Sequence, residues 1–235
     1  MNKKVKKKNP LKLKACVVAL SLWGLSSVLA LSSSPVMAAE TASNTAQEQV
    51  AMALFNKGFD LGNLHRYEEA LAANNDVITR FSNSQDKIIQ EAVANALLNK
   101  GGDLGSLHRY EEAIAAYNDV ITRFGNSQDK LIQRQVANAL FNKVGDLYEL
   151  HRYEEAGAAY DDFITRFSNS QDIKIQEQVA NALFNKGAAL RRLHRIGQAR
   201  ADWEELVYRF KDNPDVDIQK TVANARDNLL DTRNF

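Results

Sequence analysis

Four histidines stand at equal spacing along the chain and are its most obvious candidates for metal or proton chemistry. They lie 43 residues apart, and each precedes an arginine: His65, His108, His151 and His194. A metal ion needs ligands that converge at about 2.0–2.1 Å, whereas equivalent residues of successive packed helices lie roughly 8–10 Å apart. The spacing therefore favours a turn or packing role over a metal site. A weak response to pH stays open as an alternative, because histidine titrates near ~6.5.

Asparagines recur with the same period and could supply hydrogen bonds to a ligand. The pairs are Asn95 and Asn99, Asn138 and Asn142, Asn181 and Asn185, and Asn224 and Asn228, and Asn56 extends the series toward the N-terminus. Residues four apart share one helix face, and asparagine is a mediocre helix former, so its repeated use needs a reason. An amide both donates and accepts. The row could therefore hold the backbone of a bound peptide, or bond neighbouring helices to each other.

Nothing in the sequence predicts catalysis. It contains no Ser-His-Asp elbow, no glycine-rich phosphate loop and no metal-binding helix motif. Adjacent carboxylates such as Glu68 and Glu69 do not face each other on a helix, which indicates solvated charges. A repeated unit also argues against an active site, which is usually one asymmetric constellation. We therefore expect no enzyme activity, no cofactor and no metal site.

The first forty residues resemble a targeting signal. Seven lysines fall within residues 1–14, residues 15–31 are apolar and uncharged, and residues 32–39 read SSSPVMAA. This three-part pattern predicts a secretory signal peptide (residues 1–38) that is cleaved after Ala38. The remaining chain would then be secreted or periplasmic, without stable membrane insertion. The alternative is a membrane anchor formed by uncleaved residues 15–31.

The charge of the remaining chain excludes one class of partner. Without the seven N-terminal lysines the net charge falls from +1 to −6, so a basic nucleic-acid-binding body is not expected. The only cysteine, Cys16, lies in the N-terminal stretch. The body of the protein therefore has no disulfide and no zinc-thiolate site.

The body of the chain is one unit repeated. Residues 51–93 match residues 94–136 at 33 of 43 positions, and apolar residues at helical spacing predict two helices per unit. Asn83 and Ser84 are suitable N-caps for the third helix. The nine predicted helices cover residues 44–64, 67–81, 86–107, 110–124, 129–150, 153–167, 173–193, 196–210 and 214–231. Residues 39–43 form a short flexible start, residues 44–231 form the domain, and residues 232–235 form a tail.

The helix pairs resemble the tetratricopeptide repeat over residues 44–231. Four features carry the resemblance. They are a leucine (Leu54, Leu97, Leu140, Leu183), a small residue (Gly58, Gly101, Gly187, with Val144 in the third unit), an alanine (Ala70, Ala113, Ala156, Ala199) and an aromatic residue (Tyr117, Tyr160, Trp203, with Asn74 in the first unit). The period of 43 departs from the family's 34. The resemblance implies an all-α fold, a right-handed α-α solenoid of four repeats closed by a C-terminal capping helix.

The resemblance also implies a function. In this family the first helix of each repeat lines a concave groove, and some members hold an extended peptide there with a row of asparagines. We therefore expect a non-catalytic interaction scaffold for a protein or peptide partner, with homo-oligomerisation left open. The expected groove residues are Asn56, Asn95, Asn99, Asn138, Asn142, Asn181, Asn185, Tyr148 and Arg191. The alternative is a self-assembling or spacing structural protein of the cell envelope.

Overall fold

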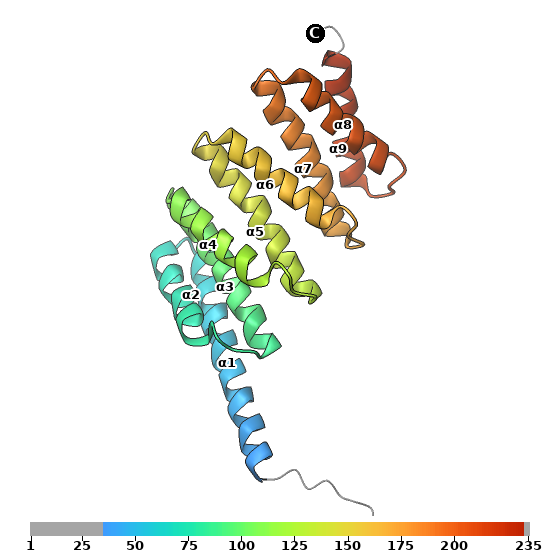
Figure 1. Ribbon diagram of the computed structural model, residues 1–235. Helices are drawn as coiled ribbons and strands as arrows, with labels where there is room; N and C mark the ends of the chain where they lie inside the picture. The colour runs from blue at the N-terminus through green and yellow to red at the C-terminus, as the bar shows by residue number, and fades with distance from the viewer. Residues whose placement is uncertain (1–34, 233–235) are drawn as a thin grey trace, which may run out of the picture.

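The computed structural model describes residues 35–232, and within this range the chain forms nine helices and no strand (Figure 1). The apolar segment 15–31 and the start of the signal peptide lie outside the described residues. The helices are α1 (Pro35–Asn63), α2 (Tyr67–Phe81), α3 (Lys87–Ser106), α4 (Tyr110–Phe124), α5 (Lys130–Glu149), α6 (Tyr153–Phe167), α7 (Ile173–Arg192), α8 (Ile196–Phe210) and α9 (Val216–Asp231). The predicted all-α solenoid of helix pairs is confirmed.

The helices form two layers. Successive odd-numbered helices contact one another from α1 to α9, whereas each even-numbered helix contacts mainly the helices before and after it in the chain. We call α1, α3, α5, α7 and α9 the inner layer and the even-numbered helices the outer layer. The surface of the inner layer that faces away from the outer layer is called the inner face. Because the inner helices are the more closely packed, the inner face is the concave side of the solenoid.

A large core cluster lies between the two layers, and Leu61, Ala70 and Ala73 of the first repeat form a small separate cluster. The largest fully buried side chains of the large cluster include Trp203, Phe163, Leu97, Leu140 and Leu183. The alanines at the close-contact position, such as Ala113 and Ala156, have no exposed surface. Small side chains there let the helix backbones approach each other, so each repeat buries its apolar face against the next.

The histidines end the first helix of each repeat. His65, His108, His151 and His194 adopt φ values of 58°, 59°, 57° and 58°, in the left-handed region that follows many helix ends. The amide of Arg109 donates to the carbonyl of Leu104 and the amide of His108 to that of Gly105, both at 2.9 Å. These bonds satisfy carbonyls that the helix end would otherwise leave free. The turn role predicted for the histidines is what the structure shows.

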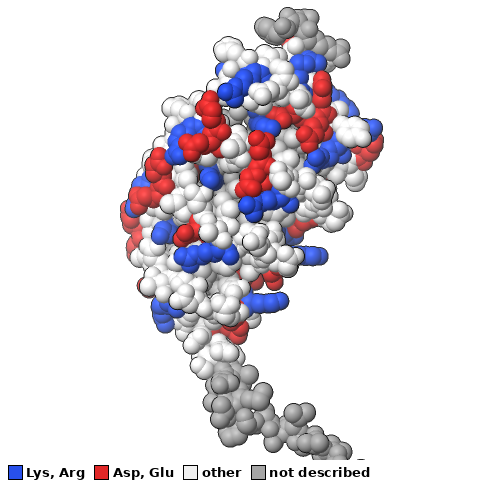
Figure 2. All heavy atoms as spheres, in the orientation of Figure 1, with Lys and Arg blue, Asp and Glu red and all other residues white. Residues whose placement is uncertain are grey.

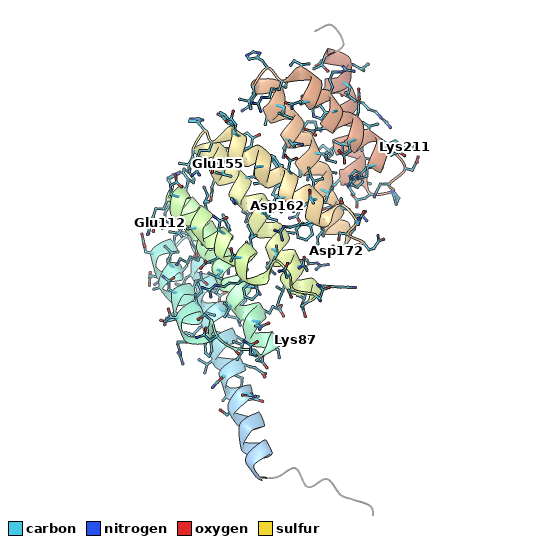
Figure 3. All side chains as sticks on the ribbon, viewed as in Figure 1. Lys87, Glu112, Glu155, Asp162, Asp172 and Lys211 are labelled. Carbon is cyan, nitrogen blue, oxygen red and sulfur yellow. The ribbon has the colours of Figure 1, made fainter. Side chains whose placement is uncertain are left out.

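The residues after each histidine fix the turn further. The Nδ1 atom of His108 lies 2.7 Å from the hydroxyl of Tyr110, and Arg109 donates two hydrogen bonds to Glu112. Arginines also pair with a glutamate of the preceding repeat, as Arg152 does with Glu111 at 2.8 Å. Figure 3 shows Glu112 and Glu155 at this edge of the solenoid, with Lys87 and Asp172 at the opposite edge, where one repeat is joined to the next.

We expect His108→Gly to stabilise the protein by about 0.5–1 kcal/mol, because glycine adopts a positive φ without the strain that an L side chain carries. The gain is reduced by loss of the contact with Tyr110. His108→Val should instead destabilise by about 1 kcal/mol or more, because a β-branched residue fits this region poorly. Urea unfolding of the two variants measures both. A glycine variant clearly less stable than the parent would show that the His–Tyr contact outweighs the backbone strain.

Two details at helix starts differ from the sequence predictions. Helix α1 begins at Pro35 rather than at residue 44, because proline suits a first helical turn and no breaker follows it. The predicted cleavage point after Ala38 lies inside this helix, and cleavage stays a prediction. Helix α3 is capped by Asp86, whose side chain accepts from the amides of Ile88 and Ile89, rather than by Asn83 or Ser84. The hydroxyl of Ser84 accepts from the amide of Asp86 and shapes the loop before the cap.

Helix α1 projects beyond the other helices (Figure 1), and its residues 42–50 are exposed apart from Glu48. Among the helices of residues 35–232, none combines the length and hydropathy needed to cross a bilayer. Figure 2 shows basic and acidic side chains interspersed over the displayed face, without a large region of one sign.

Candidate functional site

A pocket of about 430 Å³ opens on the inner face between the first three inner helices. Helix α1 contributes Gly58, Phe59, Gly62 and Asn63, the turn after it His65, and the start of α2 Tyr67. Helix α3 contributes Leu98, Asn99, Gly102, Asp103 and Ser106, and helix α5 contributes Asn142. No lysine or arginine is among these residues. Two of the predicted site residues, Asn99 and Asn142, lie in this one pocket.

At the base of this pocket, the first repeat has a polar residue where later repeats have an aromatic one. Where later repeats place Tyr117, Tyr160 or Trp203, the first repeat places Asn74, which has no exposed surface. Its Nδ2 donates to Oδ2 of Asp103 at 3.1 Å. Its Oδ1 atom and the Nδ2 atom of Asn99 are buried and have no hydrogen-bond partner among the described residues. Buried polar groups are nearly always paired, so these two atoms mark an unsatisfied site.

Asp103 is the most unusual side chain of the pocket. It is only 7% exposed, and Gly62 of the neighbouring inner helix makes room for it. A β-carbon at Gly62 would lie 3.0 Å from the Asp103 carboxylate. Burial raises the pKa of Asp103 to about 6, and the hydrogen bond from Asn74 only partly opposes this. Among the described residues, no cation offsets the buried charge.

Asp146 repeats this arrangement one unit further along the inner face. It lies against Gly105, where a β-carbon would lie 3.2 Å from its Oδ1 atom. Its Oδ2 atom is buried without a hydrogen-bond partner in the described part of the chain. Burial raises the pKa of Asp146 to about 6, and the charge of Glu149 raises it further. Two successive repeats thus each place one carboxylate without a cation on the inner face.

The asparagine row divides into two sets with different surroundings. In the first set, Asn138 accepts from Gln178 at 2.7 Å and Asn181 accepts from Thr221 at 3.0 Å. Both bonds join neighbouring inner helices, while Asn95 at the same register is half-buried. In the second set, Asn142 and Asn185 form side-chain hydrogen bonds with Tyr117 and Tyr160, whose pKa values burial raises. Asn56 is exposed on α1.

Tyr148 and Arg191, which were also expected in the groove, lie apart from the pocket. Tyr148 is half-buried and packs edge-on against Tyr153, with ring centroids 5.5 Å apart. Arg191 is exposed, donates to Oδ1 of Asn228 at 2.9 Å and lies 6.0 Å above the Trp203 ring. Each helps to hold a helix contact in the C-terminal half.

Sequence reasoning missed Asp103, Asp146 and Asn74. A signal for the acids was present, since Asp60, Asp103 and Asp146 share one register and Ala189 occupies it in the fourth repeat. Each lies in a helix segment otherwise built of small and apolar residues. Their burial depends on glycines of the preceding repeat, and this pairing is visible only in the assembled solenoid.

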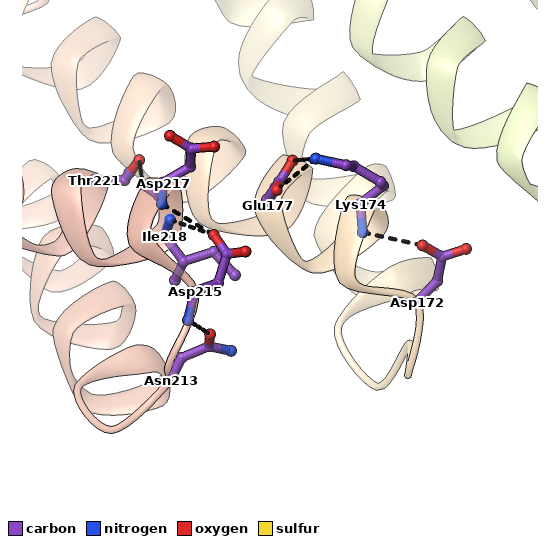
Figure 4. Close-up of polar contacts among 8 residues, drawn as sticks. All are labelled: Asp172, Lys174, Glu177, Asn213, Asp215, Asp217, Ile218 and Thr221. Atoms are coloured by element: carbon purple, nitrogen blue, oxygen red, sulfur yellow. Dashed lines mark hydrogen bonds and ion pairs between the residues drawn. The ribbon is translucent and has the colours of Figure 1, made fainter.

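A second acidic group lies at the C-terminal end. Carboxylate oxygens of Glu177, Asp215 and Asp217 lie within 4.8 Å of one another. Figure 4 shows that two of these acids already have partners: Lys174 pairs with Glu177 at 2.8 Å, and Asp215 caps α9 through the amides of Asp217 and Ile218. This group is explained by helix capping and ion pairing.

Comparison with known proteins supports the fold. A crystal structure of a tetratricopeptide repeat protein from Parabacteroides merdae is similar to this chain, with a TM-score of 0.55 and 15% sequence identity. The match covers 79% of this chain and 65% of that protein. No family model matches the sequence, and no curated protein matches it. The chain therefore has a fold like that of tetratricopeptide repeat proteins.

Proposed function

We propose that the protein is a non-catalytic scaffold that binds a segment of a partner protein on its inner face. The observation that carries this proposal is the pocket between α1, α3 and α5, where Asn99 and Asn142 meet and the Nδ2 atom of Asn99 is unpaired. An extended peptide carries backbone carbonyls and amides that amide side chains can pair with. A repeated array of such groups would bind the backbone of a segment without recognising each of its side chains.

The partner is expected outside the cytoplasm. This part of the proposal rests on the N-terminal sequence alone: the lysine-rich start, the apolar residues 15–31 and the small residues before Ala39. The protein would then meet its partner in the periplasm or outside the cell. Fractionation of the producing cells, with detection of the processed N-terminus by mass spectrometry, tests this location.

Changing Asn99, Asn142 and Asn185 together to alanine should weaken partner binding about 100-fold. Each hydrogen bond contributes about 1 kcal/mol, and 1.4 kcal/mol corresponds to a tenfold change. The partner is first identified by placing a photo-crosslinking residue at Ser106, which is exposed at the pocket, with Asp76 of the outer layer as the comparison position. Affinity of the purified pair is then measured by calorimetry.

The matched control changes Asn83, Asn126 and Asn169 to alanine, because these three are exposed in the loops at the edge of the solenoid. Circular dichroism confirms the helix content of both triple variants. Binding that survives the inner-face substitutions, or crosslinks that form equally from Asp76, would contradict the proposal.

A specific observation also favours the alternative function of self-assembly. Helix α1 exposes Val50, Met52, Phe59 and Leu64, although Val93, the equivalent of Val50, is buried in the second repeat. The first inner helix thus has an apolar surface that no preceding repeat covers. A strict monomer at high concentration in analytical ultracentrifugation would exclude self-assembly through this surface.

A further inference from the structure

The polar groups of the pocket indicate which kind of ligand group would pair with them. In the described part of the chain, the Asn74 Oδ1 acceptor behind Gly58 and the Asn99 Nδ2 donor have no hydrogen-bond partner. The carboxylate of Asp103 has one hydrogen bond, from Asn74, and no cation beside it among these residues. A β-carbon at Gly58 would lie 2.6 Å from Asn74 Oδ1, which places that amide directly behind the pocket wall. Acceptors and negative charge predominate, so the missing group is a positively charged donor.

The walls suit the stem of such a group. Phe59, which is 50% exposed, and Tyr67 line the pocket beside Asp103. Aromatic faces attract a cation and also cover the methylene stem of a lysine or arginine side chain. A carboxylate at the base with aromatic rings at the rim is an arrangement that recognises a basic side chain.

The fold does not require the acids. The fourth repeat places Ala189 at the register of Asp103 and Asp146, and this alanine is buried with 5% exposure. An acid buried without a cation weakens the folded state. Its presence in successive repeats is therefore explained by a ligand rather than by packing.

We propose that Asp103, followed by Asp146 in the next repeat, binds basic side chains of an extended partner segment in the inner-face pocket. This inference rests on the proposed function and names the partner's chemistry. Neighbouring inner helices lie roughly 8–10 Å apart, and an extended chain rises about 3.3 Å per residue. The basic side chains of the segment therefore recur at about every third residue.

The probe is a fluorescein-labelled twelve-residue peptide with lysine at every third position and serine or alanine between. The comparison peptides carry glutamine or glutamate in place of lysine. Fluorescence anisotropy with the full chain should show binding of the lysine peptide at least about tenfold tighter than of the glutamine peptide, because hydrogen bonds to charged groups are the stronger ones. The glutamate peptide should bind weakest.

Asp103→Asn should remove at least about tenfold of the affinity for the lysine peptide, while leaving the bond from Asn74 and the shape of the pocket. Asp76→Asn is the matched control, since Asp76 is exposed on the outer layer. The two variants have the same net charge, so a general effect of charge would weaken both equally. Equal weakening, unchanged binding by Asp103→Asn, or equal binding of the lysine and glutamine peptides would overturn the inference.

Two further readouts separate the alternatives. Spermidine is tested as a competitor of the lysine peptide. If spermidine binds as tightly as the peptide and with the same dependence on Asp103, the ligand is a free polyamine rather than a protein segment, and the inference fails. If the lysine peptide shows no preference while the inner-face asparagine variant still loses its partner, this inference fails and the proposed function stands. If crosslinking from Ser106 captures no partner, the proposed function fails.

Binding of the lysine peptide should weaken as the pH falls from 7.5 to 5. The carboxyls of Asp103 and Asp146 become protonated near pH 6 and lose their attraction for a cation. The other titratable groups at this place are His65 and Tyr67 at the pocket rim and Tyr117, which lies within electrostatic reach of both acids. Glu149 and Tyr110 lie within electrostatic reach of Asp146. Binding that is unchanged between the two pH values would contradict the inference.

Discussion

Gly101→Ala is expected to lower the free energy of unfolding by about 2–3 kcal/mol, although alanine is the better helix former by about 1 kcal/mol. A β-carbon at residue 101 would lie 2.6 Å from Cζ and 2.7 Å from Cδ1 of Tyr117, whose side chain is buried. Helix α3 or α4 must therefore move, and overpacking of this kind typically costs 1–3 kcal/mol or more. Urea denaturation followed by circular dichroism measures the change.

The neighbouring glycine is the control. A β-carbon at Gly102 would have no atom within 4 Å, so Gly102→Ala should gain about 0.5–1 kcal/mol from helix propensity alone. The two variants have the same composition and differ only in which face of α3 carries the new methyl group. Equal stabilities would show that the α3–α4 contact yields easily, as the contact that holds Val144 in the third repeat does.

Asp103→Asn is expected to stabilise the protein at pH 7.5 by about 1–3 kcal/mol. The pKa of Asp103 is raised by burial to about 6, whereas an aspartate in an unfolded chain titrates near ~3.9. The folded state therefore binds a proton more tightly, and the contribution of this group to stability is greatest below about pH 4. It decreases as the pH rises through about 6. Asparagine has no charge to bury, so the variant avoids this loss of stability at high pH.

The gain from Asp103→Asn should disappear at pH 4, where the parent carboxyl is protonated. Unfolding midpoints of both proteins at pH 4 and pH 7.5 measure the difference. Asp76→Asn, at an exposed site, should change stability by no more than about 0.5 kcal/mol at either pH. An Asp103→Asn variant that is less stable than the parent at pH 7.5 would show that the carboxylate stabilises the fold. A stable variant that no longer binds a basic peptide would separate the binding role of Asp103 from folding.

Much of the fold was predictable because the same apolar spacing and the same polar loops occur in all four repeats. Most helix boundaries lie within one or two residues of the predicted ones, since apolar spacing and polar loops act locally. The exception is the start of α1, where helix-forming residues continue past the predicted boundary to Pro35. The αL conformation of the histidines could not be assigned in detail, because several residue types end helices and only the observed φ values distinguish them.

The candidate site was predictable only in part. Asn99 and Asn142 could be placed on one inner face from their register, and they do share a pocket. The register did not show that Asn138 and Asn181 bond to the next inner helix, because that depends on Gln178 and Thr221 in the following repeat. Asp103 was missed for a similar reason, since its burial requires Gly62 on one side and Asn74 on the other.

Tyr148 replaces the glycine that stands at residues 62 and 105 of the earlier repeats, and α5 and α7 share the slightest contact of any neighbouring inner helices. The bulky ring in place of a glycine accounts for that separation. We therefore expect the solenoid to behave as two stiffer blocks, α1 to α6 and α7 to α9, joined by a flexible joint at which bending concentrates. Binding of a partner that spans both blocks fixes the angle between them, and the conformational entropy lost in doing so lowers the affinity. A partner confined to the first three repeats leaves the joint free to bend.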